Sequence, residues 1–115
     1  MISDRDISVL EDILYSIKLL EKYSHDLSED EFYQSQEKQD LIVHRLEIIG
    51  EASKRLSEKT INKYPEIPWK EMKGMRDVLI HQYDNIMLRT VWNVLNERIP
   101  EIKKKIVEAH EKESM

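Results

Sequence analysis

Four residues with chemically versatile side chains lie close together between positions 76 and 83: Arg76, Asp77, His81 and Tyr83. The planar guanidinium of arginine fits a phosphate group, and histidine is well suited to proton transfer near neutral pH. On a helix that turns by about 100° per residue, Asp77 and His81 lie one turn apart on one face. We therefore expect Asp77 to orient and charge-stabilise His81, with Arg76 and Tyr83 beside them.

Such a group of side chains suits the cleavage of a phosphodiester that has a neighbouring 2′-hydroxyl group. A base removes the hydroxyl proton, an acid protonates the leaving oxygen, and arginine stabilises charge on the non-bridging oxygens. One histidine per chain is few for two proton-transfer roles, so a symmetric dimer would supply a second copy. Ile80 lies on the polar side of the predicted helix and indicates a subunit contact. The residues alone also leave open a capping or surface role for His81.

The spacing of apolar residues predicts helices along the whole chain. Steps of three and four residues indicate helices at about 4–24, 36–58 and 69–82, and another after an N-cap at Asp84. Ser28-Glu29-Asp30-Glu31 has the spacing of a capping box. We predict an all-α fold, an antiparallel bundle of four to five helices that forms a single domain over residues 1–115.

The last predicted helix has an apolar seam with a period of about 3.5 residues. Its phase continues through Pro100, where we expect a kink and not the end of the helix. The seam residues are Leu88, Trp92, Leu95, Ile99, Ile102, Ile106 and Ala109. Before the third helix, two prolines at 65 and 68 predict a loop.

Composition excludes several classes of protein. The 115-residue chain contains only two Gly and three Pro, which argues against turn-rich β folds, and it has no Cys for disulfides, thiolate metal sites or a Cys nucleophile. The longest run without Asp, Glu, Lys or Arg covers seven residues, 90–96, whereas a membrane span needs about 20 apolar residues. The acidic N-terminus lacks the apolar core of a signal peptide, so we expect a cytoplasmic protein and no membrane partner.

The formal net charge of −5 is unevenly distributed along the chain. Residues 1–53 have 5 basic and 13 acidic side chains, a net charge of −8, while residues 54–115 have 13 basic and 10 acidic side chains, a net charge of +3. The half that contains Arg76, His81 and the basic run 103–105 is thus the one that a phosphate would meet. A set of solvated helix surfaces explains the same distribution.

Several other residues have a structural and a functional interpretation. Glu47 and Glu51 lie one turn apart and could be paired acids, but pairing of Glu51 with Arg55 or with a neighbouring helix is the simpler interpretation. Gly50 and Gly74 are expected to allow close packing. The remaining histidines, His25, His44 and His110, show no metal-binding spacing, so no metal is expected. Trp69 and Trp92 could stack on bases but are more typical of a core.

Residues 76–83, Arg-Asp-Val-Leu-Ile-His-Gln-Tyr, resemble the RX4HXY motif of HepT-like toxins, within the wider HEPN class of helical ribonucleases. Three further stretches resemble this family in the same order along the chain: Gly-Glu-Ala after Ile49, Pro-Glu-Ile-Pro-Trp at 65–69, and Val-Trp at 91–92. Family members more often have Asn after the motif arginine, where this chain has Asp77. The ordered set is far more specific than the short motif alone.

The resemblance implies a metal-independent endoribonuclease that needs no cofactor and forms a homodimer, or a higher oligomer, with the motif lining the cleft between chains. Arg76 would bind the scissile phosphate of RNA, His81 would be the acid/base, and Asp77 would support His81. The implied partner is a minimal nucleotidyltransferase antitoxin that transfers AMP onto Tyr83. Each AMP would add about one negative charge and a bulky nucleoside beside Arg76, and would so compete with RNA.

Two alternatives from other classes remain open. The first is a non-catalytic helical dimer that binds a nucleotide or a partner protein, which the acidic total charge, Asp77 beside Arg76 and the single motif histidine favour. The second is a purely structural dimer formed by the seam from Leu88 to Ala109, in which changes of Arg76 or His81 have no effect.

Overall fold

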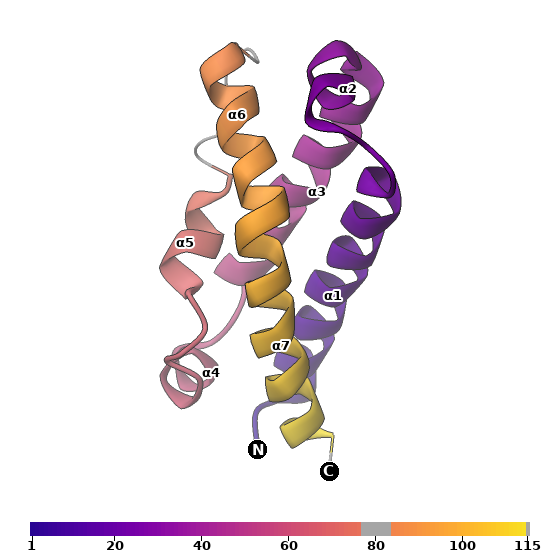
Figure 1. Cartoon of the computed structure of the whole chain (residues 1–115). Coiled ribbons are helices and arrows are strands. Elements are labelled where there is room, and N and C mark those ends of the chain that lie inside the picture. The colour runs from indigo at the N-terminus through magenta and orange to yellow at the C-terminus, as the bar shows by residue number, and fades with distance from the viewer. Residues whose placement is uncertain (77–83, 115) are drawn as a thin grey trace.

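The computed structural model describes residues 1–76 and 84–114, and this part of the chain is helical with no strand (Figure 1). The elements are α1 (Asp4–Ser24), α2 (Glu29–Gln34), α3 (Gln36–Lys54), α4 (Glu58–Lys63), α5 (Trp69–Gly74), α6 (Asn85–Asn93), the π-helical turn η2 (Val94–Arg98) and α7 (Ile99–Glu113). The long helix α1 packs against α3 and α7, and α5 packs against α3. The predicted all-α helical bundle is confirmed.

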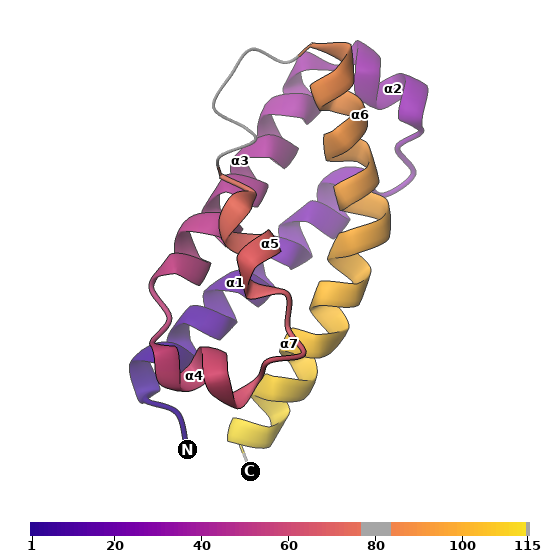
Figure 2. The same ribbon diagram turned by 90° about the vertical axis from the view of Figure 1, so that its left-hand side faces the viewer.

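Apolar stripes on the long helices meet in one core. Side chains at the predicted helical spacing are fully buried on α1, α3 and α7, as are Phe32 of α2 and Met72 of α5. The buried residues of the long helices include Leu10, Ile17, Leu20, Ile42, Leu46, Ile49, Ile102 and Ile106. Burial of this apolar surface is the main force that holds the bundle together. The core thereby fixes α3, against which α5 packs (Figure 2).

Local capping signals set several helix ends where the sequence predicts them. Helix α1 begins after Ser3, whose side chain accepts a hydrogen bond from the backbone N–H of Asp6. Ser28 and Glu31 form the predicted capping box at the start of α2. Asp84 caps α6 by accepting from the backbone N–H of Met87 at 2.8 Å. These caps satisfy backbone donors that have no partner within the helix.

The predicted helix over 36–58 is confirmed over 36–54, but the chain breaks at residues 55–57 and starts again as α4. The buried carboxylate of Asp6 on α1 accepts hydrogen bonds from the Ser57 hydroxyl at 2.6 Å, the Thr60 hydroxyl at 2.5 Å and the Ser57 backbone N–H at 3.3 Å. Burial raises the pKa of Asp6, but these hydrogen bonds outweigh it and hold the pKa below its usual value. Asp6 thus caps α4 from another helix.

The last predicted helix continues through Pro100, as expected. The irregularity predicted at this proline takes the form of the π-helical turn η2, which ends at Arg98. Proline has no backbone N–H and its ring crowds the carbonyl four residues earlier, so a wider turn just before Pro100 accommodates it. The seam residues are buried on both sides of η2, while Trp92 is half-buried against the ring of Phe32, 5.5 Å between centroids.

A buried carboxylate joins the two ends of the chain, which lie at the same end of the molecule (Figure 1). Glu113 of α7 accepts hydrogen bonds from the backbone N–H of Ile2 at 2.8 Å and from the Tyr64 hydroxyl, and pairs with Lys63 Nζ at 2.6 Å. Lys63, Tyr64 and the Ile2 N–H lower the pKa of Glu113 to about 2, while burial and Glu113 raise the pKa of Tyr64 to about 12. We call Glu113, Ile2, Lys63 and Tyr64 the Glu113 clasp.

Candidate functional site

Arg76 lies two residues after the end of α5, and its side chain reaches back to α3. Its Nη1 atom lies 2.6 Å from Oε1 of Glu51, and the two side chains are 50% and 51% exposed. The guanidinium is therefore held at one edge and open to solvent at others. Of the interpretations that the sequence leaves for Glu51, pairing with a neighbouring segment is the one found, whereas Arg55 pairs with Asp12 at 3.6 Å.

Gly50 lets the backbone of Arg76 approach α3 closely. A Cβ atom placed on Gly50 would lie 3.0 Å from the backbone N of Arg76 and 3.2 Å from the carbonyl oxygen of Met72. The expectation of close packing is confirmed here. It is wrong for Gly74, where an added Cβ would meet no atom within 4 Å. The glycine before the motif is thus not required by packing, although the one in the Gly-Glu-Ala stretch is.

The loop before α5 fixes where this helix begins. Pro68 occupies the N-cap position, and Trp69 is buried with its indole Nε1 donating to the carbonyl oxygen of Tyr64 at 2.9 Å. Trp69 is therefore a core residue, as the simpler interpretation predicts. Met72, one turn later, is fully buried. These contacts anchor α5 against the core and so determine where the chain reaches Arg76.

The helix predicted over 69–82 is longer than the one observed in the described residues. Helix α5 ends at Gly74, and the backbone N–H of Met75 bonds to the Met72 carbonyl three residues earlier, at 3.2 Å. Such an i→i+3 bond closes a tight last turn at a helix end. Met75 and Arg76 therefore belong to a turn, and not to a continuous helix that begins at Trp69.

The other predicted site residues, Asp77, Ile80, His81 and Tyr83, lie outside the described residues. Their roles stay predictions from the sequence. Arg76 is the member of the predicted group whose contacts the structure describes.

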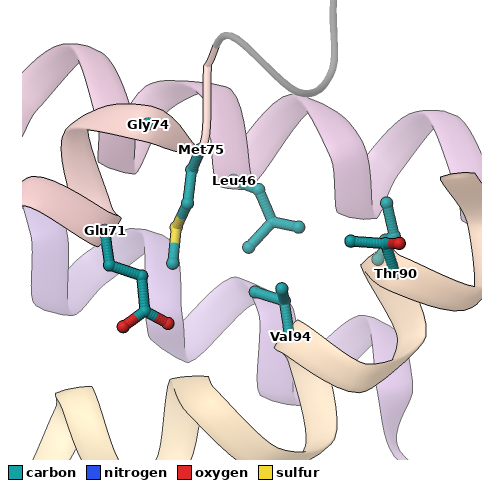
Figure 3. Close-up of a pocket in the computed structure, with 7 residues that line it drawn as sticks. Leu46, Glu71, Gly74, Met75, Thr90 and Val94 are labelled. Carbon is teal, nitrogen blue, oxygen red and sulfur yellow. The ribbon is translucent and has the colours of Figure 1, made fainter.

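An apolar pocket that the sequence did not predict lies between α3, α5 and the α6–η2 run (Figure 3). Its volume is about 190 Å³. It is lined by Leu46, Glu71, Gly74, Met75, Thr90, Val91 and Val94. The carboxylate of Glu71 is held at its edge by Arg98, whose Nε and Nη2 atoms donate to it at 2.7 and 2.9 Å. A pocket formed by three separate segments leaves no signal in the local pattern of any one of them.

The basic run at 103–105 is partly neutralised by acidic neighbours. Lys103 contacts Glu21 of α1 at 2.8 Å, and Lys105 contacts Glu101 at 3.4 Å. The run therefore does not form a block of three unpaired cations. Half-exposed pairs of this kind contribute little to stability and are screened by salt.

Two of the remaining histidines contact acidic residues other than Glu51. His110 lies 3.1 Å from Glu11, and His25 lies 3.3 Å from Asp26 at the end of α1. Within residues 1–76 and 84–114, no group of three or more His, Asp or Glu side chains is placed to hold a metal ion. In the same part of the chain, no helix combines the length and apolar character of a membrane span.

Comparison with known proteins identifies a family whose model matches most of this chain. The family model "Ribonuclease HepT-like" matches residues 13–109, which include α3, α5, Arg76 and the whole of the motif. The match covers the bundle and is not confined to the short motif. No solved structure matches this chain.

Curated relatives agree with this family. The chain is 43% identical over 108 residues to a "Gamma-glutamylcyclotransferase and putative RNase" of Methanocaldococcus jannaschii, covering 93% of this chain and 49% of that protein. It is 40% identical to a "Putative RNase" of the same organism, over 86% of this chain and 82% of the relative. It is 41% identical to the "Probable ribonuclease HepT" of Thermococcus cleftensis, over 84% of this chain and 87% of the relative. The chain thus spans about half of the first relative and most of the other two.

Proposed function

This chain belongs to the HepT-like ribonuclease family, so its activity class is endoribonuclease, and we propose that it is the toxin of a toxin–antitoxin pair. The observation that carries the proposal is the half-exposed guanidinium of Arg76, held on α3 inside a region that matches the family. A cation that is fixed at one edge and open at others suits a phosphate of RNA.

In the proposed reaction, Arg76 binds the scissile phosphate and stabilises charge on its non-bridging oxygens. His81 transfers protons to or from the reacting oxygens, and Asp77 supports His81. The 2′-hydroxyl of RNA is the nucleophile, so no metal ion is required. Two chains form a homodimer with the motif in the cleft between them, and the second copy of His81 supplies the second proton-transfer group.

The proposed regulation uses the same segment. A minimal nucleotidyltransferase antitoxin transfers AMP from ATP onto the hydroxyl of Tyr83: the Tyr83 oxygen bonds to the α-phosphorus, the bond from that phosphorus to the bridging oxygen of the β-phosphate breaks, and pyrophosphate and the hydroxyl proton leave. The added phosphodiester has a charge of about −1 and competes with RNA for Arg76, while the nucleoside fills the cleft. The proposal places both proteins in the cytoplasm.

The test is expression of the protein in a bacterial host, alone and together with the antitoxin. Alone, the wild-type protein should stop growth and degrade RNA, and purified protein should cleave RNA in the presence of a chelator. Arg76→Ala and His81→Ala should each lower cleavage by at least about 100-fold with unchanged helicity, because each removes one group that acts in the transition state. With the antitoxin, the intact mass should increase by one or more AMP units on the peptide that contains Tyr83.

Each arm of this experiment can overturn a different part of the proposal. A folded protein that leaves growth and RNA unaffected is no toxin, and a fully toxic His81→Ala variant removes the catalytic assignment. An unmodified Tyr83 in a neutralised complex indicates inhibition by binding alone. Nucleotide binding without cleavage of RNA would support the non-catalytic module.

A further inference from the structure

Glu51 and Gly50 both act on Arg76 from a single turn of α3. Gly50 admits the backbone of Arg76, since an added Cβ would lie only 3.0 Å from its nitrogen. Glu51 binds the guanidinium of the same residue at 2.6 Å. Helix α3 thus contacts both the backbone and the side chain of the arginine that we expect to bind phosphate.

Helix α3 is a rigid base for these contacts. It is 19 residues long, and its buried residues Ile42, Leu46 and Ile49 are at most 1% exposed. Arg76, by contrast, lies in a turn after the end of α5 and has a long side chain that is half-exposed. Without a partner, such a side chain samples many rotamers and must lose this freedom when it binds a ligand.

We propose that Glu51 is a positioning residue that holds the Arg76 guanidinium ready for the RNA phosphate, an inference that rests on the proposed ribonuclease function. Arginine has five N–H donors in a planar fork. The carboxylate of Glu51 engages Nη1, while the Arg76 side chain stays 50% exposed and thus accessible to a phosphate. Preorganisation of this kind lowers the barrier because the charge-stabilising group is already oriented when the reaction begins.

The pair has a second consequence, because a carboxylate beside a phosphate site also repels RNA. Replacing Glu51 by Gln keeps an oxygen that can accept from Nη1 but removes the negative charge. Replacing it by Ala removes both the contacting oxygen and the charge. The two substitutions therefore separate orientation from electrostatic repulsion.

A matched pair elsewhere in the molecule provides the control. Glu21 of α1 contacts Lys103 of α7 at 2.8 Å, with side chains 51% and 43% exposed, close to the values for Glu51 and Arg76. Glu21→Ala therefore removes a carboxylate from an ion pair of similar exposure and similar expected effect on stability, but it involves neither Arg76 nor α3.

The experiment measures kcat and KM for cleavage of a short RNA oligonucleotide by full-length wild type, Glu51→Ala, Glu51→Gln and Glu21→Ala. We expect Glu51→Ala to lower kcat about tenfold or more, because orientation is lost in the transition state. Glu51→Gln should keep kcat within about threefold of wild type and lower KM, since repulsion is removed. Glu21→Ala should leave both constants unchanged, and circular dichroism should show the same helicity for all four proteins.

Equal kcat for wild type and Glu51→Ala would overturn the positioning role while the ribonuclease function stands. A kcat for Glu51→Gln as low as that for Glu51→Ala would overturn it too, because an accepting oxygen would then not suffice. If wild type cleaves no RNA, the proposed function fails. Binding of a non-cleavable 2′-deoxy oligonucleotide then tests whether Glu51 positions Arg76. Weaker binding by Glu51→Ala than by Glu51→Gln, with a shifted Arg76 Nε–H signal in nitrogen-15 spectra, then supports the contact, and identical binding and spectra refute it.

Discussion

At the scale of single residues, the two glycines of the chain differ in the atoms that surround them. Gly50 faces backbone atoms of Met72 and Arg76, which cannot rotate away as a side-chain tip can. Gly74, at the end of α5, faces open space. The sequence does not distinguish the two, because Gly50 belongs to the Gly-Glu-Ala stretch and Gly74 lies two residues before Arg76, where the motif begins.

Gly50→Leu should destabilise the protein by about 1–3 kcal/mol, because the new side chain must push the start of the motif away from α3. Gly74→Leu is the matched control and should change stability by no more than about 0.5 kcal/mol. Urea denaturation of both variants checks this. RNA cleavage should also fall in Gly50→Leu, because the contact between Glu51 and Arg76 depends on the close approach. Equal stability of the two variants would contradict the role assigned to Gly50.

At the scale of elements, the helix ends that were predicted correctly depend on neighbours in sequence. The caps at Ser3, Ser28 and Asp84 each bond to a backbone N–H three residues later, so their signal lies within one turn. The break between α3 and α4 depends instead on Asp6, which is 51 residues from Ser57. A carboxylate from another helix thus holds the start of α4, which no local pattern could show.

The features of the candidate site also divide into those with a local sequence signal and those that depend on distant segments. Residue types and spacing were enough to select Arg76 and to expect close packing at Gly50, because both belong to short stretches that resemble a known family. The contact between Arg76 and Glu51 is not among the sequence predictions, which leave Glu51 paired with Glu47, with Arg55 or with an unspecified neighbouring helix, because it joins α3 to the turn after α5. The 190 Å³ pocket was not predicted, because three segments far apart in sequence form its walls.

Asp6→Ala should destabilise the protein by about 1–3 kcal/mol, since it leaves the Thr60 hydroxyl buried without its acceptor and removes the cap of α4. Asp4→Ala is the control, because Asp4 is an exposed residue in the same first turn of α1. It should cost no more than about 0.5–1 kcal/mol through the helix dipole. Thermal unfolding of both variants measures the difference. Equal losses would show that Asp6 contributes no more than any acidic residue at this helix end.

At the scale of the whole molecule, the Glu113 clasp joins the first residues of the chain to its last helix. Glu113 is almost fully buried, and it binds the backbone of Ile2 and the side chains of Lys63 and Tyr64. Its partners come from two separate parts of the sequence, residue 2 and residues 63–64. The clasp therefore stabilises the arrangement of α1, α4 and α7 together and not any one helix.

The clasp predicts a specific dependence of stability on pH. The pKa of Glu113 is lowered from an ordinary value of 4.5 to about 2, so its ionised form stabilises the folded state above about pH 5. This stabilisation is lost as the pH falls through 4.5 toward 2. The free energy of unfolding of Glu113→Gln should therefore lie below that of wild type at pH 7, and the gap should close between about pH 5 and 2.

Glu111→Gln, an exposed change two residues away in α7, should leave the difference from wild type small at every pH. Denaturation by urea across this pH range measures all three proteins. A gap between wild type and Glu113→Gln that is as wide at pH 3 as at pH 7 would show that the ionised carboxylate is not the source of the stabilisation.

The Glu113 clasp also predicts that the protein tolerates a domain fused to either end and a circular permutation of the chain. Because Ile2 and Glu113 are bonded, the two ends of the chain leave the bundle side by side, while the C-terminal end of α5, which leads to Arg76, points away from them (Figure 1). A second protein domain attached at either end would therefore begin on the side of the molecule away from the C-terminal end of α5. The ends could equally be joined to each other and the chain reopened in another loop, and such a circular permutant should still bring Arg76 to Glu51.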